Sequence, residues 1–495
     1  MKTAFDTKAD AGLHESEPAK KVQLPFILGG KSIKPDEKGN QKISMLGGEV
    51  SFPNPEILTS LLESLHNPLI EVSTQDIIGF LHRLGKMWEN DEYIRRRVYI
   101  RQMCDFVGYS EQMAVAEADL IAATLRGSTR LWDTLQVELG DRSILDTWIK
   151  REDCEVKAFP KGTVTHILSG NAPVAAVLSI LRSLLTKNQT IAKVASGDPI
   201  TPTQFALSFL DLDAKHPLSR SLHTAYWPSD SEIGVSIVGN TDAVCVWGGA
   251  EAVRWTYKNV KPGSEILTFG PKRSFSLIGG SGQKDLKNAA RLVAHDVSMY
   301  DQQACFSTQH IFVLGDQFEF ATELGSALDR NQKILSAPKR TVDQAADVSL
   351  SKIHHEFFGG KILYSEDHSW QVILSSPGKT YRHPGARTAF VHKIDSIEQV
   401  LSFVDSSVQT VAVYPMEIVK HFRDSLGRLG ISRVVECGSS GMYRLGASHD
   451  GMYPLARLVR FVSMEAPSEV YPKGMTIPMD MSKIIEHRQF RDLFV

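Results

Sequence analysis

Residues 163–173 read TVTHILSGNAP, and this stretch decides the fold class of the chain. Its first six residues combine β-branched and apolar side chains, as a buried strand does. The strand is expected to end at residues 169–173, and an apolar helix is expected over 174–185. A strand followed directly by a helix is half of a strand–helix–strand unit, which builds parallel sheets.

The alternation continues along the chain and predicts an α/β fold. Further strands are expected at 190–194, 223–227, 243–247 and 265–269, and Thr201-Pro202 has the N-cap-then-proline pattern of a helix start. Such units form a parallel sheet with helices on both faces and a ligand site at the carboxyl ends of the strands.

A tight turn into a helix is predicted between the last two of these strands. Its residues are Gly248, Gly249 and Ala250. The phosphate-binding pattern G-x-G-x-x-G is absent from the chain, so the glycine pair by itself is a weak indication of a nucleotide site.

A second informative stretch, residues 299–309, reads MYDQQACFSTQ. Cys305 follows a helical pattern and precedes a strand-like run at 311–314. A thiol at such a junction can lie at the mouth of a cleft, where backbone N–H groups favour the nucleophilic thiolate. The alternative is that Cys305 is a small buried apolar residue, as free cysteines usually are. Its polar neighbours make a core position less natural, but this stretch alone leaves both interpretations open.

Composition excludes several classes of protein. The chain has 495 residues and a formal net charge of −2, which offers no basic surface for nucleic acid or anionic membrane. Five widely spaced cysteines without a C-x-x-C pair argue against disulfides and a metal site and favour a reducing compartment. The longest apolar run, 172–181, is too short to span a membrane. With no signal sequence at the start, a cytoplasmic protein is expected.

The length predicts more than one domain. We expect a disordered segment at 1–22, a cofactor-binding domain at 23–270, a catalytic domain at 271–445 and a terminal segment at 446–495. The first domain should carry a helical layer from about 55 to 145, in which Ser73 caps a helix. In the terminal segment, His449 beside an Asp-Gly turn is interpreted as structural.

Several motifs carry a family resemblance. Those that resemble the cofactor domain of the aldehyde dehydrogenase superfamily are residues 169–173, Asn188, Lys193 and Thr201-Pro202. Within that superfamily, the blocks at 158–162, 184–189, 300–307 and 448–452 resemble the LuxC family, the fatty acyl reductases of bacterial luminescence. The resemblance implies an aldehyde-dehydrogenase-like fold: a Rossmann-type cofactor domain, an α/β catalytic domain and a small oligomerisation arm within 446–495.

The resemblance also implies an activity. It is the NADPH-dependent reduction of a long-chain fatty acyl thioester, acyl-CoA or acyl-protein, to the fatty aldehyde for luminescence. Cys305 would carry the acyl group, and Asn171 would donate to the oxyanion together with the backbone N–H of Cys305. Lys193, Ser196 and the turn Gly248-Gly249-Ala250 would bind the cofactor.

The partners implied by the resemblance are an acyl-protein synthetase, a myristoyl transferase and further copies of this chain. No metal and no nucleic acid are expected.

Departures from the superfamily are informative. Thr268 stands where hydrolytic members have a glutamate that activates water, and threonine is no general base near neutral pH. If another group activates water, Glu251, His295 and His383 are the first candidates. Ser196 stands where NAD-preferring members often have an acid, which favours a 2′-phosphate.

Three alternatives remain from the sequence. They are a hydrating NAD(P)-dependent aldehyde dehydrogenase, a cofactor-independent cysteine acyltransferase or thioesterase, and a non-catalytic acyl-binding subunit.

Overall fold

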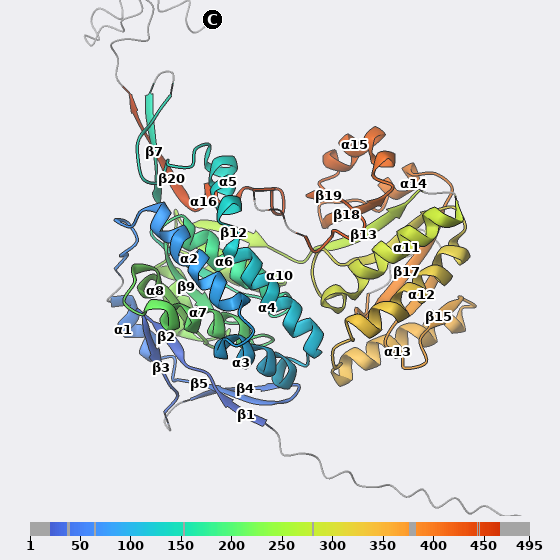
Figure 1. The fold of residues 1–495 in the computed structure, drawn as a ribbon, viewed down its shortest axis with the longest axis horizontal. Coiled ribbons are helices and arrows are strands. Elements are labelled where there is room, and N and C mark those ends of the chain that lie inside the picture. Colours follow the sequence, from blue (N-terminus) through green and yellow to red (C-terminus); the bar gives the residue numbers. More distant parts are fainter. Residues whose placement is uncertain are drawn as a thin grey trace, which may run out of the picture.

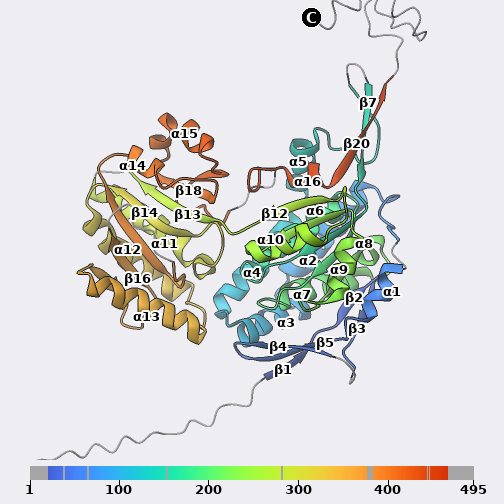
Figure 2. The same ribbon diagram turned by 180° about the vertical axis from the view of Figure 1, so that it is seen from behind.

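The computed structural model describes residues 20–36, 40–63, 66–151, 154–279, 282–375, 383–442, 444 and 446–465. Two α/β lobes lie side by side, and a narrow arm projects from the first lobe (Figures 1 and 2). The predicted disordered segment 1–22 lies outside the described residues except at its end, where strand β1 (Lys20–Gln23) begins.

A seven-stranded sheet organises the first lobe, in the order β12-β11-β8-β9-β10-β2-β3. Its strands are β2 (Phe26–Leu28), β3 (Lys31–Ile33), β8 (Thr163–Ile167), β9 (Gln189–Lys193), β10 (Leu222–Ala225), β11 (Ala243–Trp247) and β12 (Glu265–Phe269). The five strands from β8 to β12 pair in parallel, which confirms the predicted parallel sheet. β2 and β3 add an antiparallel edge.

Helices cover both faces of this sheet (Figure 1). They are α1 (Ile57–Glu63), α2 (Thr74–Glu89), α3 (Ile94–Gln102), the π-helix η1 (Met103–Val107), α4 (Glu111–Arg126), α5 (Ser128–Leu139), α6 (Pro173–Leu185), α7 (Ile200–Asp213), α8 (Pro217–Ser221), α9 (Glu232–Gly239) and α10 (Ala250–Asn259). The helical layer at 55–145 is therefore present. Apolar residues of α2, α4, α5, α6 and α7 form the main core, and α9 and α10 pack on the opposite face.

The N-termini of α2 and α7 are the places where the sequence predicted N-caps, at Ser73 and Thr201. Ser73 caps α2, because its Oγ accepts a hydrogen bond from the N–H of Asp76 at 3.0 Å. The predicted cap at Thr201 is wrong: α7 begins at Ile200, and the buried Asp198 side chain accepts from the N–H groups of Ile200 and Thr201. A carboxylate reaches two N–H groups of the first turn, which a threonine already inside that turn cannot do.

The second lobe contains another seven-stranded sheet, in the order β15-β16-β17-β14-β13-β18-β19. Its strands are β13 (Arg273–Ile278), β14 (Thr308–Leu314), β15 (Ile362–Tyr364), β16 (Gln371–Ser375), β17 (Thr388–Ile394), β18 (Val408–Tyr414) and β19 (Arg433–Glu436). All neighbours pair in parallel except β15. The chain passes from one sheet to the other between Phe269 and Arg273.

Two helical layers enclose the second sheet. The helices are α11 (Gln283–Ser298), the 3₁₀ helix η2 (Met299–Gln302), α12 (Gln317–Ile334), α13 (Val342–Phe357), α14 (Glu398–Leu401), the 3₁₀ helix η3 (Met416–His421) and α15 (Arg423–Arg428). Alternate residues of β14 divide the core, since Ile311 and Val313 pack toward α11 and α12 whereas Phe312 packs toward α14 and η3. This is the side-chain alternation of a sheet buried on both faces.

Two small sheets complete the fold. One consists of β1, β4 (Gln41–Met45) and β5 (Gly48–Phe52). The other forms the arm, from β6 (Ile149–Lys150), β7 (Cys154–Pro160) and β20 (Val459–Glu465), which follows the short helix α16 (Pro454–Arg457). Phe461, Val462 and Met464 of β20 are exposed. The predicted oligomerisation role of this arm stays a prediction, and residues 466–495 lie outside the described residues.

No described helix is both long and apolar enough to span a membrane.

Candidate active site

The candidate site lies where the two large sheets face each other. The loops that follow β8, β11 and β12 in the first lobe meet the segment that precedes β14 in the second. Between them is a cavity of about 740 Å³. The predicted site residues that line it are Asn171, Gly248, Gly249 and Cys305. Four of the seven predicted residues are therefore brought together, although they are far apart in the chain.

The segment before Cys305 has an unusual backbone. Tyr300, Asp301 and Gln302 all have positive φ angles, of 53°, 50° and 61°. Each such non-glycine residue is strained, because Cβ approaches the backbone closely in the left-handed region. Gln302 helps to hold the turn, since its buried Nε2 donates to the carbonyls of Thr308 and Thr388, each at 2.8 Å.

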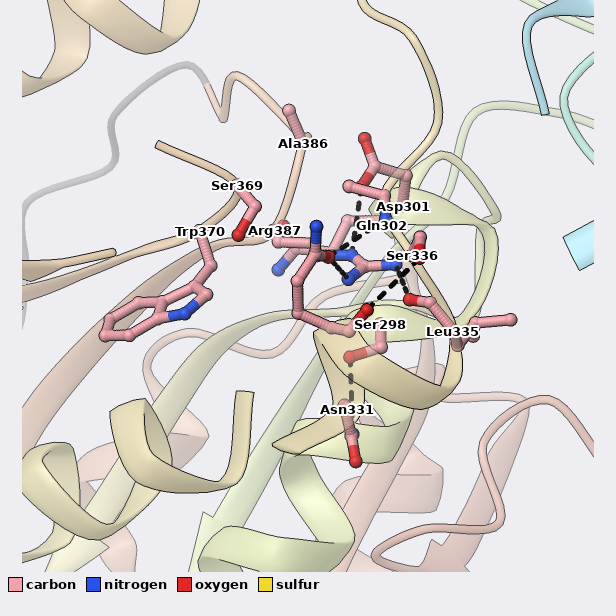
Figure 3. Close-up of polar contacts among 12 residues, drawn as sticks. Ser298, Asp301, Gln302, Asn331, Leu335, Ser336, Ser369, Trp370, Ala386 and Arg387 are labelled. Carbon is pink, nitrogen blue, oxygen red and sulfur yellow. Dashed lines mark hydrogen bonds and ion pairs between the residues drawn. The ribbon is translucent and has the colours of Figure 1, made fainter. Parts of the chain in front are cut away.

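A buried ion pair supports the same turn (Figure 3). Asp301 Oδ1 lies 3.2 Å from Nε of Arg387, and both side chains are almost completely buried. Arg387 also donates to Gln332 Oε1 and to the carbonyl of Leu335, each at 2.7 Å. A buried guanidinium with this many partners fixes the carboxylate and thereby the turn that presents Cys305.

The Cys305 sulfur lies among polar groups. Gln409, the second residue of β18, places its Nε2 at 3.1 Å from Sγ and at 2.6 Å from Oδ1 of Asp450. Burial, and secondarily the charge of Asp450, raise the pKa of the Cys305 thiol to about 11. Gln409 and the backbone N–H groups of Cys305 and Phe306 act in the opposite direction. The backbone groups expected around the thiol are therefore present, but the resting site holds a thiol near neutral pH.

Asn171 lines the same cavity as Cys305, from the loop between β8 and α6. Its Nδ2 donates to the carbonyl of Gln303 at 2.8 Å. Gly170 allows this loop to approach its neighbour, because a Cβ there would lie 2.7 Å from backbone atoms of Gly197 and Asp198. The side chain is thus held within the cavity, and its predicted oxyanion role stays a prediction.

The glycine turn suits a nucleotide. Gly248 and Gly249 follow β11, and Ala250 is the first residue of α10. A Cβ at Gly249 would meet no atom within 4 Å, so the N-terminus of α10 is open to the cavity. Such a helix start favours a pyrophosphate through its free N–H groups and dipole.

Lys193 and Ser196 lie outside the Cys305 cavity. Ser196 lines a smaller cavity of about 260 Å³, which shares Gly170, Gly197 and Gln303 with the larger one. Lys193 ends β9 and packs over the rings of Tyr226 and Trp227, and burial lowers its pKa to about 8. Their predicted contacts with a cofactor stay predictions.

Thr268 is not in the position of a catalytic base. Its neighbour Phe269 lines the cavity, whereas Thr268 does not and pairs with Val246, whose side chain packs on the opposite face of the sheet. The three substitute bases named from the sequence are also elsewhere. Glu251 is on the exposed side of α10, His295 lines another cavity beside α4, and His383 is partly buried and hydrogen-bonded to the backbone carbonyl of Thr388.

Sequence reasoning missed Gln409 and Asp450. Among the described residues that line the cavity, Asp450 is the single acidic one. The sequence indicated only a turn at this Asp-Gly pair. Its φ of 49° shows that Asp450 is a turn residue, as the sequence indicated. The turn pattern gave no sign that its carboxylate also contacts Gln409 beside Cys305. Gln409 is a fully buried polar residue in an apolar strand, and that mismatch was the available signal.

His449 occupies the wall next to Asp450. Its ring contacts those of Trp247 and Phe269 edge-on, at centroid distances of 5.3 and 5.1 Å. This agrees with the structural interpretation from the sequence. The described part of the chain contains no group of three or more His, Cys, Asp or Glu side chains arranged to hold a metal ion.

Comparison with known proteins gives a consistent result. Residues 69–461 match the acyl-CoA reductase family LuxC. The long-chain acyl-protein thioester reductase of Vibrio harveyi is 38% identical over 478 residues, which cover 94% of this chain and 98% of that protein. The protein of the same name from Aliivibrio fischeri is 39% identical over 425 residues, covering 85% and 88%.

Solved structures with the same fold are distant in sequence. The NADP-dependent glyceraldehyde-3-phosphate dehydrogenase of Bacillus halodurans, complexed with NADP, superimposes with a TM-score of 0.70 at 14% identity and covers 90% of this chain and 99% of its own. A mutant aldehyde dehydrogenase of Pseudomonas syringae, complexed with NAD⁺ and octanal, gives 0.66 at 12% identity, covering 90% and 98%. The predicted aldehyde-dehydrogenase-like α/β fold is thereby confirmed.

Proposed function

The chain belongs to the LuxC family of acyl-CoA reductases, and from that premise we propose that it reduces a long-chain fatty acyl thioester to the aldehyde through an acyl group on Cys305. It is an oxidoreductase that acts on an acyl group. The observation that carries the proposed mechanism is the position of Cys305, in one cavity with Asn171 and the Gly248-Gly249 turn. The other four cysteines, all within the described residues, lie outside this cavity.

Acyl transfer is the first step. The Cys305 sulfur attacks the thioester carbonyl, a new carbon–sulfur bond forms, and the bond to the donor's sulfur breaks. The donor leaves as a thiol with the proton that Cys305 gave up. One thioester replaces another, so the acyl group keeps its activation.

The carbonyl oxygen gains negative charge during transfer and again during reduction. Reduced nicotinamide, when bound, supplies a hydride to the carbonyl carbon. Asn171 Nδ2 and the backbone N–H of Cys305 would donate to that oxygen. The carbon–sulfur bond to Cys305 then breaks, which releases the aldehyde and regenerates the thiolate.

The acyl chain has an apolar wall available. Leu120 and Ala123 of α4 and Val174, Ala175 and Leu178 of α6 line the same cavity. A hydrocarbon chain gains free energy there by leaving water. We therefore place the chain along these residues of α4 and α6.

NADPH is the hydride donor that we favour. Ser196 brings no negative charge to oppose a 2′-phosphate, and Lys193, three residues earlier, places a cationic side chain at the end of β9. The phosphate would have to reach these residues beyond the Cys305 cavity.

The setting of the activity is also a proposal. The five free cysteines suit a reducing compartment, and we place the enzyme in the cytoplasm. There it would supply aldehyde for luminescence, with an acyl-protein synthetase, a myristoyl transferase and further copies of itself as partners.

The test is to measure the intact mass of the protein after exposure to a long-chain acyl-CoA. We expect a gain of one acyl group, which disappears with formation of aldehyde when NADPH is added. Cys305→Ala should lose both the label and the aldehyde, whereas the matched variant Cys104→Ala, at a half-buried thiol outside the cavity, should keep both. Full labelling of Cys305→Ala, or labelling at Cys104, Cys154, Cys245 or Cys437, would contradict the proposal.

A further inference from the structure

The amide of Gln409 connects the nucleophile to a carboxyl group. Its Nε2 is within hydrogen-bond distance of both Cys305 Sγ, at 3.1 Å, and Asp450 Oδ1, at 2.6 Å. The Gln409 side chain is fully buried at the start of β18. An amino group carries two hydrogens, so one can be directed at the sulfur and the other at the carboxylate.

Asp450 decides which end of the amide faces the sulfur. An ionised carboxylate only accepts hydrogen bonds, so it draws the amino end toward itself and repels the carbonyl end. Gln409 Oε1 is buried and has no hydrogen-bond partner among the described residues. An unpaired buried acceptor costs free energy. The contacts of the amino group with Cys305 Sγ and Asp450 must outweigh that cost, and they therefore set the orientation of the amide.

The proposed reaction needs a thiolate at Cys305 twice. The thiolate is the nucleophile in acyl transfer, and it is the leaving group when the thiohemiacetal collapses to aldehyde. Burial and the Asp450 charge both disfavour it. A donor directed at the sulfur stabilises the anion in both steps, and it does so without taking part in proton transfer.

We propose that Gln409 is a catalytic residue whose amino group stabilises the Cys305 thiolate, and that Asp450 positions this amino group. The catalytic role in reduction rests on the function proposed above. The effect on the thiol itself does not, because it exists in the free protein.

Other charged groups near this pair are few. Burial raises the pKa of Asp450, whereas the hydrogen bond from Gln409 and the charges of Lys272 and Arg182 act in the opposite direction. His449 lies beside it with Nδ1 at 3.0 Å from Arg182, and burial lowers the pKa of that imidazole, so it stays neutral. The positive charges therefore act on Asp450, and Gln409 is the side chain that donates to the sulfur, beside the backbone N–H groups of Cys305 and Phe306.

The first test measures alkylation of Cys305 by iodoacetamide as a function of pH, followed by the mass of the Cys305 peptide. Gln409→Met should slow alkylation about 10- to 100-fold at a fixed pH, the usual contribution of a hydrogen bond to a charged group. The midpoint of the pH dependence of alkylation should move upward by about one to two pH units, because each tenfold loss of thiolate corresponds to one unit. An unchanged rate and profile would overturn the assignment of Gln409.

Two further variants separate this effect from loss of folding. Gln409→Glu keeps the size and brings an acceptor to the sulfur, so alkylation should slow at least as much as in Gln409→Met. Gln371→Met removes another buried amide in the same sheet, whose Nε2 donates to Thr388 Oγ1 at 3.1 Å, and should leave Cys305 alkylation unchanged. Equal slowing in Gln371→Met would show a general loss of packing and overturn the proposal.

A double-mutant cycle tests the role of Asp450. Asp450→Asn removes a repulsive charge and should speed alkylation in the Gln409→Met background. In the parent the gain should be smaller, because the amide loses the group that orients it. Equal gains would overturn the positioning role. If acyl-CoA fails to label Cys305 while these alkylation differences persist, the proposed function fails and the thiolate contact stands.

Discussion

The two sheet edges that form the cavity contribute in different ways. The first lobe presents the carboxyl ends of β8, β11 and β12, where glycines leave the backbone accessible and Ser169, Asn171 and Lys272 add polar side chains to the cavity wall. The second lobe presents the amino ends of β14 and β18, where Cys305 and Gln409 contribute their side chains. Under the proposed function, cofactor binding would use mainly backbone groups of the first edge, and the chemistry mainly side chains of the second.

The support behind the two edges differs accordingly. On the first, small residues allow close approach at Gly170 and leave the backbone open at Gly249. On the second, three consecutive residues with positive φ are held by the buried Asp301–Arg387 pair. Strained backbone persists only where surrounding contacts over-determine it. The catalytic edge should therefore be the more sensitive to mutations remote from the cavity.

Loss of the buried support should have the largest effect. Arg387→Met leaves the Asp301 carboxylate buried without its partner, which costs about 3–5 kcal/mol. We expect this decrease in the free energy of unfolding of the second lobe, with faster hydrogen exchange at residues 299–309. The control is Arg423→Met, because the 3.9 Å pair with Asp424 is exposed and contributes little. Similar loss in both variants would contradict a special role for the buried pair.

At the first edge, loss of one side chain should lower the rate of reduction without changing the stability of the protein. Asn171→Ala should slow reduction by about 10²–10³, the usual loss for one oxyanion donor, and leave the unfolding transition unchanged. Asn259→Ala removes an amide that also donates to a backbone carbonyl, that of Trp255, but outside the cavity, and should keep full activity. A rate for Asn171→Ala within a few-fold of the parent would mean that Asn171 only shapes the turn.

A smaller effect is expected at the cofactor side. Ser196→Glu should shift the preference from NADPH toward NADH by roughly tenfold, equivalent to about 1.4 kcal/mol, through repulsion of the 2′-phosphate. Ser349→Glu on the exposed surface of α13 adds the same charge elsewhere and should leave the preference unchanged. The ratio of kcat/KM values for the two cofactors measures the shift. A parent enzyme that already favours NADH would show that Ser196 does not set the preference.

Almost no effect is expected at Thr268, although this residue stands where hydrolytic members of the superfamily have a water-activating glutamate. Because Thr268 does not line the cavity, Thr268→Glu should leave the release of free fatty acid from the acyl-enzyme unchanged, measured without NADPH. In the parent this release should be slow, while added thiols discharge the acyl group. Faster acid release from Thr268→Glu would place that side chain at the reacting carbonyl.

The sequence was sufficient to predict those elements whose formation depends on residues near one another in the chain. The parallel strands from β8 to β12 and the junction at Cys305 follow from the hydrophobic pattern and from turn residues near in sequence. The family likeness was also visible in the motifs. Thr201 failed as a cap because α7 begins one residue earlier, at Ile200, where Asp198 accepts from the first N–H groups, a choice between neighbours that composition does not resolve.

Tertiary structure alone decided how the site is assembled. Gln409 lies 104 residues from Cys305 and Asp450 lies 41 residues further on, and no local pattern relates them. The face of the sheet toward which the Thr268 side chain points depends on the register of β12 against β11. A shift of one residue would place this side chain on the other face. The sequence singled out Cys305 as the candidate nucleophile, and long-range packing determined the groups that surround it.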